Sequence, residues 1–335
     1  MTDSITPPSS SRRRWLAQVG GTAAAVAATG LPPLARAQSA STFPNKPLRL
    51  VVPFGAGGSD VMARAFAEKL GGVLKQQVVV ENKPGASGLI GSEYVSMSPK
   101  DGYSMLFIGG GSLTPVLYKD LKFRILEQLK PVICIARGGM TCMTNATVPA
   151  RTLQEFAAYA KANPGKLNYS YTAGSMVLSA EMLRNQLGFE ATAVPYKGAA
   201  QVLQALITNE IQMTIDVPFN YMPMIKEGRV RPLVHGGQER SPTLPDVPTL
   251  AEVGIKDLIF AVSYGIWVAP GTPDPIVEQL NAAYNEVLKS EDIRGRLTQA
   301  AVVPVGGPPV GLYNQIKSEQ DTWAVAAAKI GYKPE

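Results

Sequence analysis

Two glycine-containing turns carry the residues best suited to chemistry in this chain. The first is residues 53–60 (PFGAGGSD) and the second is residues 171–175 (YTAGS). Glycine lets the backbone approach a ligand closely, and a helix that starts after such a turn presents N–H groups that favour an anion. Ser59 or Asp60 can cap the first helix and leave further donors free. The alternative is a glycine-rich connection that binds nothing.

The first turn fits a carboxylate better than a nucleotide. It matches neither G-x-x-x-x-G-K-[ST] nor G-x-G-x-x-G, and no lysine follows to hold phosphates. A third turn, residues 109–114 (GGGSLT), ends an apolar run and offers the hydroxyls of Ser112 and Thr114. Residues 196–199 open another helix. Asp216 ends a further apolar run, where it could accept from a ligand amine, hold a water or cap a turn of the chain.

Residue counts argue against catalysis and metal binding. The chain has one histidine, His235, and two cysteines, so neither a multi-histidine site nor a four-cysteine cluster can form. Residues 85–89 (GASGL) miss the G-x-S-x-G nucleophile motif at Leu89. We therefore expect no cofactor, no metal and no enzyme activity, and a structural role for His235. Cys134 and Cys142 are expected to be free thiols in separate strands, with a disulfide as the alternative.

The elements that must position these residues alternate along the chain. Apolar runs at residues 48–52, 78–81, 104–108, 167–171 and 211–217 predict strands, and segments with helical spacing lie between most of them. This alternation predicts parallel sheets with helices on both faces. Two β-rich segments, residues 132–136 and 140–145, follow each other closely, so they either turn tightly or pass between two lobes.

The first 37 residues have the features of an export signal. Consecutive arginines precede a weakly apolar stretch, which ends in Ala35-Arg36-Ala37 before Gln38. The arginines suggest the twin-arginine (Tat) route, and an uncleaved membrane anchor is the alternative. Removing residues 1–37 takes away one aspartate and four arginines, so the net charge falls from +6 to +3. That near balance argues against a nucleic-acid partner, and the remaining 298 residues suffice for two domains.

Short motifs spread over the whole chain after residue 42 resemble one known family. They are FPNKP at 43–47, VVPFGAGG at 51–58, ENKPG at 81–85, KDGY at 100–103, AKANPGKLNY at 160–169, VPYKG at 194–198, LPDVPT at 244–249 and APGTP at 269–273. In these motifs the chain resembles the periplasmic substrate-binding receptors of tripartite tricarboxylate transporters, also called Bug or TctC-type proteins. Compared with the family pattern, the first turn has one residue fewer before Asp60 and the second turn is about two residues shorter. Both departures fall in the predicted pocket, so the sequence leaves the ligand open.

The resemblance implies an α/β, two-lobed, type II periplasmic-binding-protein fold, in which each lobe is a mostly parallel sheet flanked by helices and the lobes close over a ligand. We assign residues 43–143 plus 262–335 to lobe I and residues 144–261 to lobe II. By resemblance, the first turn binds a ligand carboxylate through Phe54, Ala56, Gly57, Gly58, Ser59 and Asp60. The pocket walls that we predict are Gly110, Ser112, Thr172, Ala173, Gly174, Ser175 and Asp216.

The function expected from the sequence is that of a periplasmic, monomeric solute-binding receptor. It captures a small carboxylated metabolite and delivers it to the permease subunits of a tripartite tricarboxylate-type transporter. A receptor of the same fold that serves another transporter or a signalling pathway is the first alternative. An exported enzyme on a two-lobed scaffold is the second.

Overall fold

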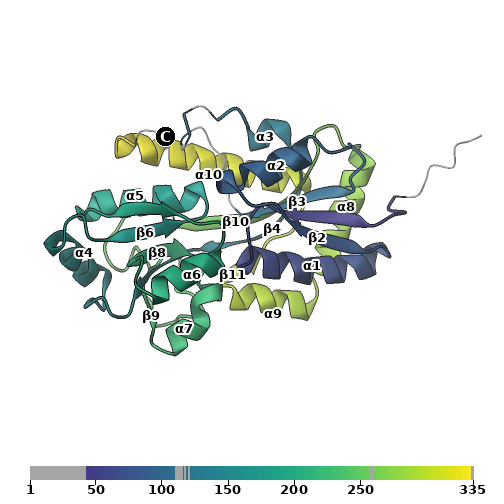
Figure 1. Cartoon of the computed structure of the whole chain (residues 1–335). Coiled ribbons are helices and arrows are strands. Elements are labelled where there is room, and N and C mark those ends of the chain that lie inside the picture. Colours follow the sequence, from purple (N-terminus) through teal and green to yellow (C-terminus); the bar gives the residue numbers. More distant parts are fainter. Residues whose placement is uncertain are drawn as a thin grey trace, which may run out of the picture. The chain divides into compact units, whose positions relative to one another are not determined.

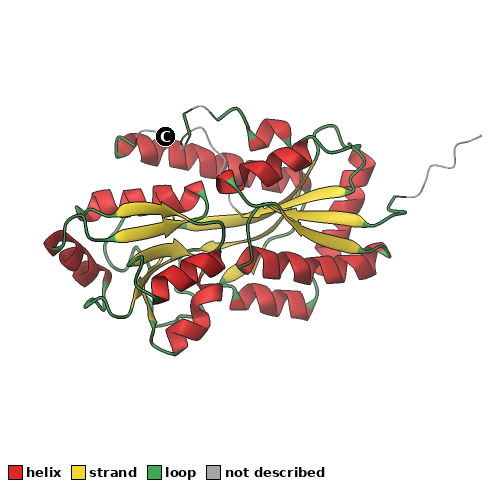
Figure 2. Cartoon of the chain, in the orientation of Figure 1, coloured by secondary structure: helices red, strands yellow, loops and turns green. Residues whose placement is uncertain are grey.

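Two β-sheets organise the residues that the computed structural model describes, which are 43–109, 116, 118–119, 121–256, 258 and 260–332 (Figure 2). All of these residues belong to one structural unit, Thr42–Glu335. The predicted signal, Gly110 and Ser112 lie outside the described residues.

The first sheet has six strands in the order β11-β4-β10-β3-β1-β2. Their bounds are β1 Leu48–Val52, β2 Val78–Asn82, β3 Ser104–Gly109, β4 Lys130–Gly139, β10 Ala261–Val268 and β11 Val302–Pro304. Strand β1 runs parallel to β2 and β3, whereas β10 is antiparallel to both β3 and β4, and β11 is antiparallel to β4. The carboxyl ends of β1 and β3 therefore lie at the same edge of the sheet.

The second sheet has five strands in the order β7-β6-β8-β5-β9. Their bounds are β5 Thr141–Asn145, β6 Asn168–Tyr171, β7 Thr192–Pro195, β8 Met213–Asp216 and β9 Val230–His235. Strand β6 is parallel to β7 and β8, and β5 is antiparallel to β8 and β9. Only Met140 separates β4 from β5, so the chain passes there from the first sheet to the second, and it returns between β9 and β10.

Helices cover both faces of the first sheet because alternate residues of its strands point to opposite sides. On one face lie α1 (Gly58–Leu74) and α9 (Glu291–Gln299), and on the other lie α2 (Leu89–Ser96), α3 (Ile125–Gln128) and α10 (Pro309–Lys329), as Figure 1 shows. Helix α8 (Asp274–Val287) packs with α1 in the same core cluster. In β1, Leu50 and Val52 belong to the same core cluster as Phe66 of α1. Val51 belongs to a second cluster with Leu312 of α10.

The second sheet is covered in the same way. The helices α4 (Leu153–Ala162) and α5 (Gly174–Leu187) contribute to the larger core cluster. A separate cluster holds α6 (Ala199–Ile207) together with the short helices η2 (Pro218–Tyr221) and α7 (Met222–Lys226). Helix α4 begins with a side-chain cap, since the hydroxyl of Thr152 accepts from the backbone N–H of Glu155 at 3.1 Å.

Helix α10 contacts elements of both sheets. Near its start, Leu312 and Ile316 pack in a cluster with Trp267 of β10. Near its end, Trp323 is 2% exposed and packs with Leu178 and Met182 of α5. The last helix of the chain therefore joins the first sheet to a helix of the second.

The predicted fold class is confirmed, with differences in detail. Both sheets are mixed instead of mostly parallel, because the strands next to the two crossings between sheets run antiparallel to their neighbours. The β-rich segments around Met140 belong to different sheets and do not form a hairpin. Strands β7 and β11 and helices α3, α7 and α9 were not predicted; the strands are four and three residues long, too short to show a period.

Three further expectations concern single residues and the chain as a whole. Cys134 and Cys142 are buried free thiols in β4 and β5, so the alternative of a disulfide is not found. His235 ends β9 and is buried, with its Nδ1 3.0 Å from the hydroxyl oxygen of Thr141, and burial lowers the pKa of its ring. In the part of the chain that the structure describes, no helix has the length and apolar character needed to cross a membrane.

Candidate functional site

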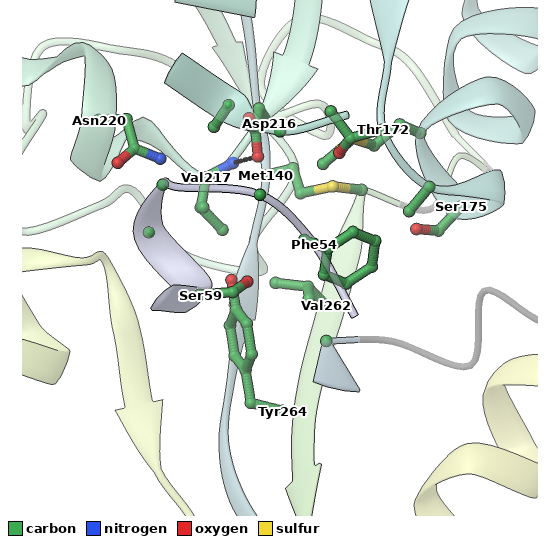
Figure 3. Close-up of a pocket in the computed structure, with 18 residues that line it drawn as sticks. Phe54, Ser59, Met140, Thr172, Ser175, Asp216, Val217, Asn220, Val262 and Tyr264 are labelled. Carbon is green, nitrogen blue, oxygen red and sulfur yellow. Dashed lines mark hydrogen bonds between the residues drawn. The ribbon is translucent and has the colours of Figure 1, made fainter. Parts of the chain in front are cut away.

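A pocket of about 560 Å³, counted with its open mouth, lies between the two sheets (Figure 3). Its walls follow the carboxyl ends of β1, β3, β6, β7 and β8, where α/β proteins bind ligands. Residues of the crossing segments, Met140, Val262 and Tyr264, complete it. The described lining residues are Phe54, Gly55, Gly57, Gly58, Ser59, Gly109, Met140, Thr172, Ala173, Ser175, Met176, Gly198, Ala199, Asp216, Val217, Asn220, Val262 and Tyr264.

Three helices begin at this pocket, and none of the three has a side-chain cap. The N-cap residues of α1, α5 and α6 are Gly57, Ala173 and Gly198. The first N–H groups of a helix have no partner inside the helix, and the helix dipole adds about half a positive charge at that end. The sequence analysis predicted two such helix starts and a cap by Ser59 or Asp60. That cap is absent, because α1 begins one residue before Ser59.

A chain of polar contacts holds the first turn in place. The carboxylate of Asp60 pairs with the guanidinium of Arg64 at 3.0 Å. Arg64 also donates to the side-chain oxygen of Asn82 at 3.2 Å, and the amide of Asn82 donates to the carbonyl oxygen of Phe54 at 3.0 Å. Asp60 therefore stabilises the turn through Arg64 and Asn82, and it is not among the described residues that line the pocket.

The first turn touches the loop before α6 directly. The backbone N–H of Gly55 donates to the carbonyl oxygen of Lys197 at 2.9 Å. A Cβ on Gly198 would lie 3.1 Å from the carbonyl oxygen of Ala56, and a Cβ on Gly57 would lie 3.1 Å from the Cβ of Ala199. Glycine thus favours the close approach of these two segments, which follow strands of different sheets.

Asp216 is the one carboxyl group among the described lining residues, and it is 3% exposed. One oxygen accepts from the backbone N–H of Val217 at 2.7 Å, and the other accepts from the hydroxyl of Tyr221 at 2.9 Å. Burial raises the pKa of Asp216 to about 6, and these two hydrogen bonds oppose that rise. Asp216 thus hydrogen-bonds within the protein, and a contact with a ligand or a ligand-bound water stays a prediction.

The other polar groups of the pocket are neutral donors and acceptors. The hydroxyl of Tyr264 hydrogen-bonds that of Ser59, and burial raises the pKa of Tyr264 well above its usual value. The hydroxyl of Thr172 donates to the sulfur of Met176 at 3.3 Å, and Ser175 is 5% exposed. Among the described lining residues there is no lysine, arginine or histidine. A ligand anion would be bound by N–H and O–H groups alone.

The structure brings most of the predicted site residues together. Those that line the pocket are Phe54, Gly57, Gly58, Ser59, Thr172, Ala173, Ser175 and Asp216. Ala56 faces the start of α6, where its carbonyl oxygen accepts from the N–H of Ala200 at 3.5 Å, and Gly174 starts α5 without lining the pocket. The binding roles of all these predicted site residues stay predictions.

Sequence reasoning did not identify several lining residues. Gly198 and Ala199 had a visible signal, since their segment was predicted to open a helix. Val262 and Tyr264 stand two apart in β10, which is the spacing of one strand face, but an apolar strand does not show which of its faces meets a pocket. Asn220 lies in η2, a single turn with no sequence signature.

This fold and this pocket define a class of protein. Two α/β sheets joined by crossing strands, with helix N-termini facing one pocket between them, are the architecture of the two-lobed periplasmic solute-binding receptors. The chain belongs to the family of tripartite tricarboxylate transporter family receptors (TctC), whose family model matches residues 62–331.

Relatives and solved structures agree with this assignment. A UPF0065 protein of Bordetella pertussis is 35% identical over 315 residues, which are 92% of this chain and 97% of that protein. Protein BugT of the same organism is 31% identical, over 88% of this chain and 92% of that protein. The solved structure of the periplasmic binding protein BugD superposes with a TM-score of 0.83 at 31% identity, covering 88% of this chain and 100% of BugD.

Two solved relatives are described with small acids. Rpa4515 of Rhodopseudomonas palustris, described with adipate, has a TM-score of 0.82 at 31% identity and covers 88% of this chain and 100% of its own. MatC of the same organism, with bound malate, has a TM-score of 0.81 at 29% identity and covers 85% of this chain and 100% of its own.

Proposed function

We propose that this chain is an exported periplasmic receptor that binds a small carboxylate between its two lobes and is not an enzyme. The observation that carries the proposal is the convergence of three helix N-termini that lack a side-chain cap on one pocket without a lysine, arginine or histidine among its described lining residues. Helix N-termini favour an anion, and N–H donors avoid the cost of desolvating a buried cation. The malate and adipate bound by two relatives support the same ligand class.

The first turn is the proposed carboxylate seat, and lobe closure completes the site. Neither sheet alone encloses the pocket, since lining residues come from both. The hydrogen bond from Gly55 to Lys197 joins the two sides of the pocket, which supports a site that both sides build together. Most of the affinity is therefore expected from closure over the ligand.

Calorimetry tests this proposal on a chain that begins at Gln38. Malate, adipate and their amides, malamide and adipamide, serve as probes. At least one acid should bind, and its amide should bind tenfold or more weakly, which corresponds to about 1.4 kcal/mol. Amides that bind as tightly as the acids would refute a carboxylate seat.

Gly57→Val tests the location of the seat. A side chain at position 57 would press on Ala199 across the pocket, so the variant should lose acid binding while the empty protein melts as before. Gly72→Ala is the matched control, because a Cβ at Gly72 of the same helix meets nothing within 4 Å. Normal binding by Gly57→Val would place the carboxylate elsewhere.

We further propose that the receptor serves the permease subunits of a tripartite tricarboxylate-type transporter. Membership of the receptor family supports this partner. Deleting the receptor gene and deleting the permease genes should abolish uptake of the same radiolabelled acid. If uptake persists without the permease but needs the receptor, another transporter uses this receptor. If neither deletion affects uptake, a signalling role is favoured.

A further inference from the structure

Asn220 presents a buried hydrogen-bond donor to the pocket. Its side-chain nitrogen, Nδ2, is shielded from solvent and has no hydrogen-bond partner among the described residues. Figure 3 shows this nitrogen pointing toward the first turn. A Cβ placed on Gly58, the first residue of α1, would lie 3.1 Å from Nδ2. A buried donor without an acceptor is costly and rare in folded proteins, so an acceptor that reaches this group would be favoured.

The turn that carries Asn220 is firmly held. The next residue, Tyr221, is fully buried and donates its hydroxyl to Asp216 at 2.9 Å. Tyr221 also packs in a cluster with Val202 and Leu206 of α6. The backbone at Asn220 is therefore held by its neighbour, and its side chain lies next to Gly58 at the start of α1.

The donors of Asn220 and of α1 face the same space. The N–H groups of Gly58 and Ser59 lie in the first turn of α1, which has no side-chain cap, and all three residues line the pocket. Donors that converge in this way need an acceptor with several lone pairs. A carboxylate has two oxygens and about four lone-pair sites, and it carries the negative charge that a helix N-terminus favours.

We infer that Asn220 is a ligand-binding residue that donates to the same carboxylate as the N-terminus of α1. The inference rests on the proposed function, because it assumes a carboxylate ligand. Helix α1 packs on the six-stranded sheet, whereas η2 follows β8 of the five-stranded sheet. A single carboxylate group thus bridges the two lobes, and the recognition of the acid is itself what draws them together.

Substitutions of Asn220 test this inference by calorimetry with malate and adipate on the chain from Gln38. Asn220→Ala removes the donor and should weaken binding of the better acid tenfold or more. Asn220→Asp keeps the shape but places a second negative charge against the carboxylate, so at pH 7.5 it should weaken binding at least a hundredfold. Neither variant loses a hydrogen bond of Nδ2 in the empty protein, so both should melt close to the wild type.

Asn185→Asp is the control, because it makes the same change of charge on an exposed part of α5 that does not line this pocket. It should bind the acids normally. An equal loss of affinity in Asn185→Asp and Asn220→Asp would mean that the added negative charge alone weakens binding. That result would overturn the inference.

The remaining outcomes separate this inference from the proposed function. If Asn220→Ala and Asn220→Asp bind the acid as tightly as the wild type while Gly57→Val does not, the inference is wrong and the carboxylate seat stands. If the wild type binds neither these acids nor any other small carboxylate, the proposed function fails and the inference falls with it. Should Asn220→Asp melt early, Asn220→Ala alone decides.

Discussion

Asp216 is a carboxyl group in a place where its charged form is disfavoured. Burial raises its pKa from an ordinary value of 3.8 to about 6 in the folded protein. Well below pH 3.8 the group is protonated in both the folded and unfolded chain. As the pH rises from about 4 to 6, the unfolded chain releases this proton first, so the contribution of Asp216 to stability is lost over that window.

The expected size of this effect is about 3 kcal/mol, since the pKa differs by about two pH units and each unit corresponds to 1.36 kcal/mol. Asp216→Asn has no such proton to release. The free energy of unfolding, measured with urea without ligand, should therefore fall between pH 4 and pH 7 in the wild type relative to the variant. A difference between the two proteins that does not change with pH would contradict the assigned shift.

Single residues also show where sequence reasoning stops. The glycines and hydroxyls of the two turns could be found, because a turn between a strand and a helix is visible in the sequence. Asn220 and Tyr264 could not, because their place in the pocket depends on how two sheets face each other. The capping of α1 by Ser59 or Asp60 was expected from residue type alone, but the helix starts at Gly58 and leaves Asp60 to pair with Arg64.

Among the elements, the loop before α6 offers the sharpest test of closure. Gly198 packs against the backbone of Gly55 and Ala56, and a Cβ would lie 3.1–3.2 Å from their atoms. Because backbone atoms cannot move aside as a side chain can, Gly198→Ala should hold the two sides apart. Acid binding should weaken tenfold or more, about 1.4 kcal/mol, in calorimetry.

The control for this variant is Gly295→Ala in α9, where a Cβ meets nothing within 4 Å. It should bind normally and be as stable as the wild type or more so, since alanine favours a helix. Undiminished binding by Gly198→Ala would show that this contact is not needed for the bound state.

The bounds of strands and helices were predicted well where a local pattern of apolar residues determines them. The strand at Leu48–Val52 has the predicted bounds, because neighbouring residues end its apolar run sharply. The direction of strands was predicted less well. Antiparallel pairing of β10 with β3 and β4 joins residues far apart in the chain, and no local pattern carries that information.

For the whole molecule, the predicted export signal leads to a direct experiment. Periplasmic protein should begin at Gln38 or within a few residues, as read by N-terminal sequencing, because Ala35-Arg36-Ala37 has the small residues of a cleavage site. Replacing Arg12 and Arg13 by lysine should reduce export by the twin-arginine route. Membrane-bound protein with an intact N-terminus would favour the anchor instead.

The packing of the last helix gives the molecule a built-in optical reporter. A chain that begins at Gln38 keeps two of the three tryptophans, Trp267 in β10 and Trp323 in α10. Trp323 packs on α5, which belongs to the other sheet, so a hinge motion of the sheets changes its surroundings. Trp267 lies inside β10 and is fully buried, so its surroundings should stay constant.

Binding of malate or adipate should therefore shift the emission of the unlabelled protein, and Trp323→Phe should remove the shift while Trp267→Phe keeps it. A shift that survives in Trp323→Phe would assign the signal to Trp267 and to the first sheet. With Trp323 as the sole emitter, stopped-flow fluorescence could time the closing of the receptor without any attached dye.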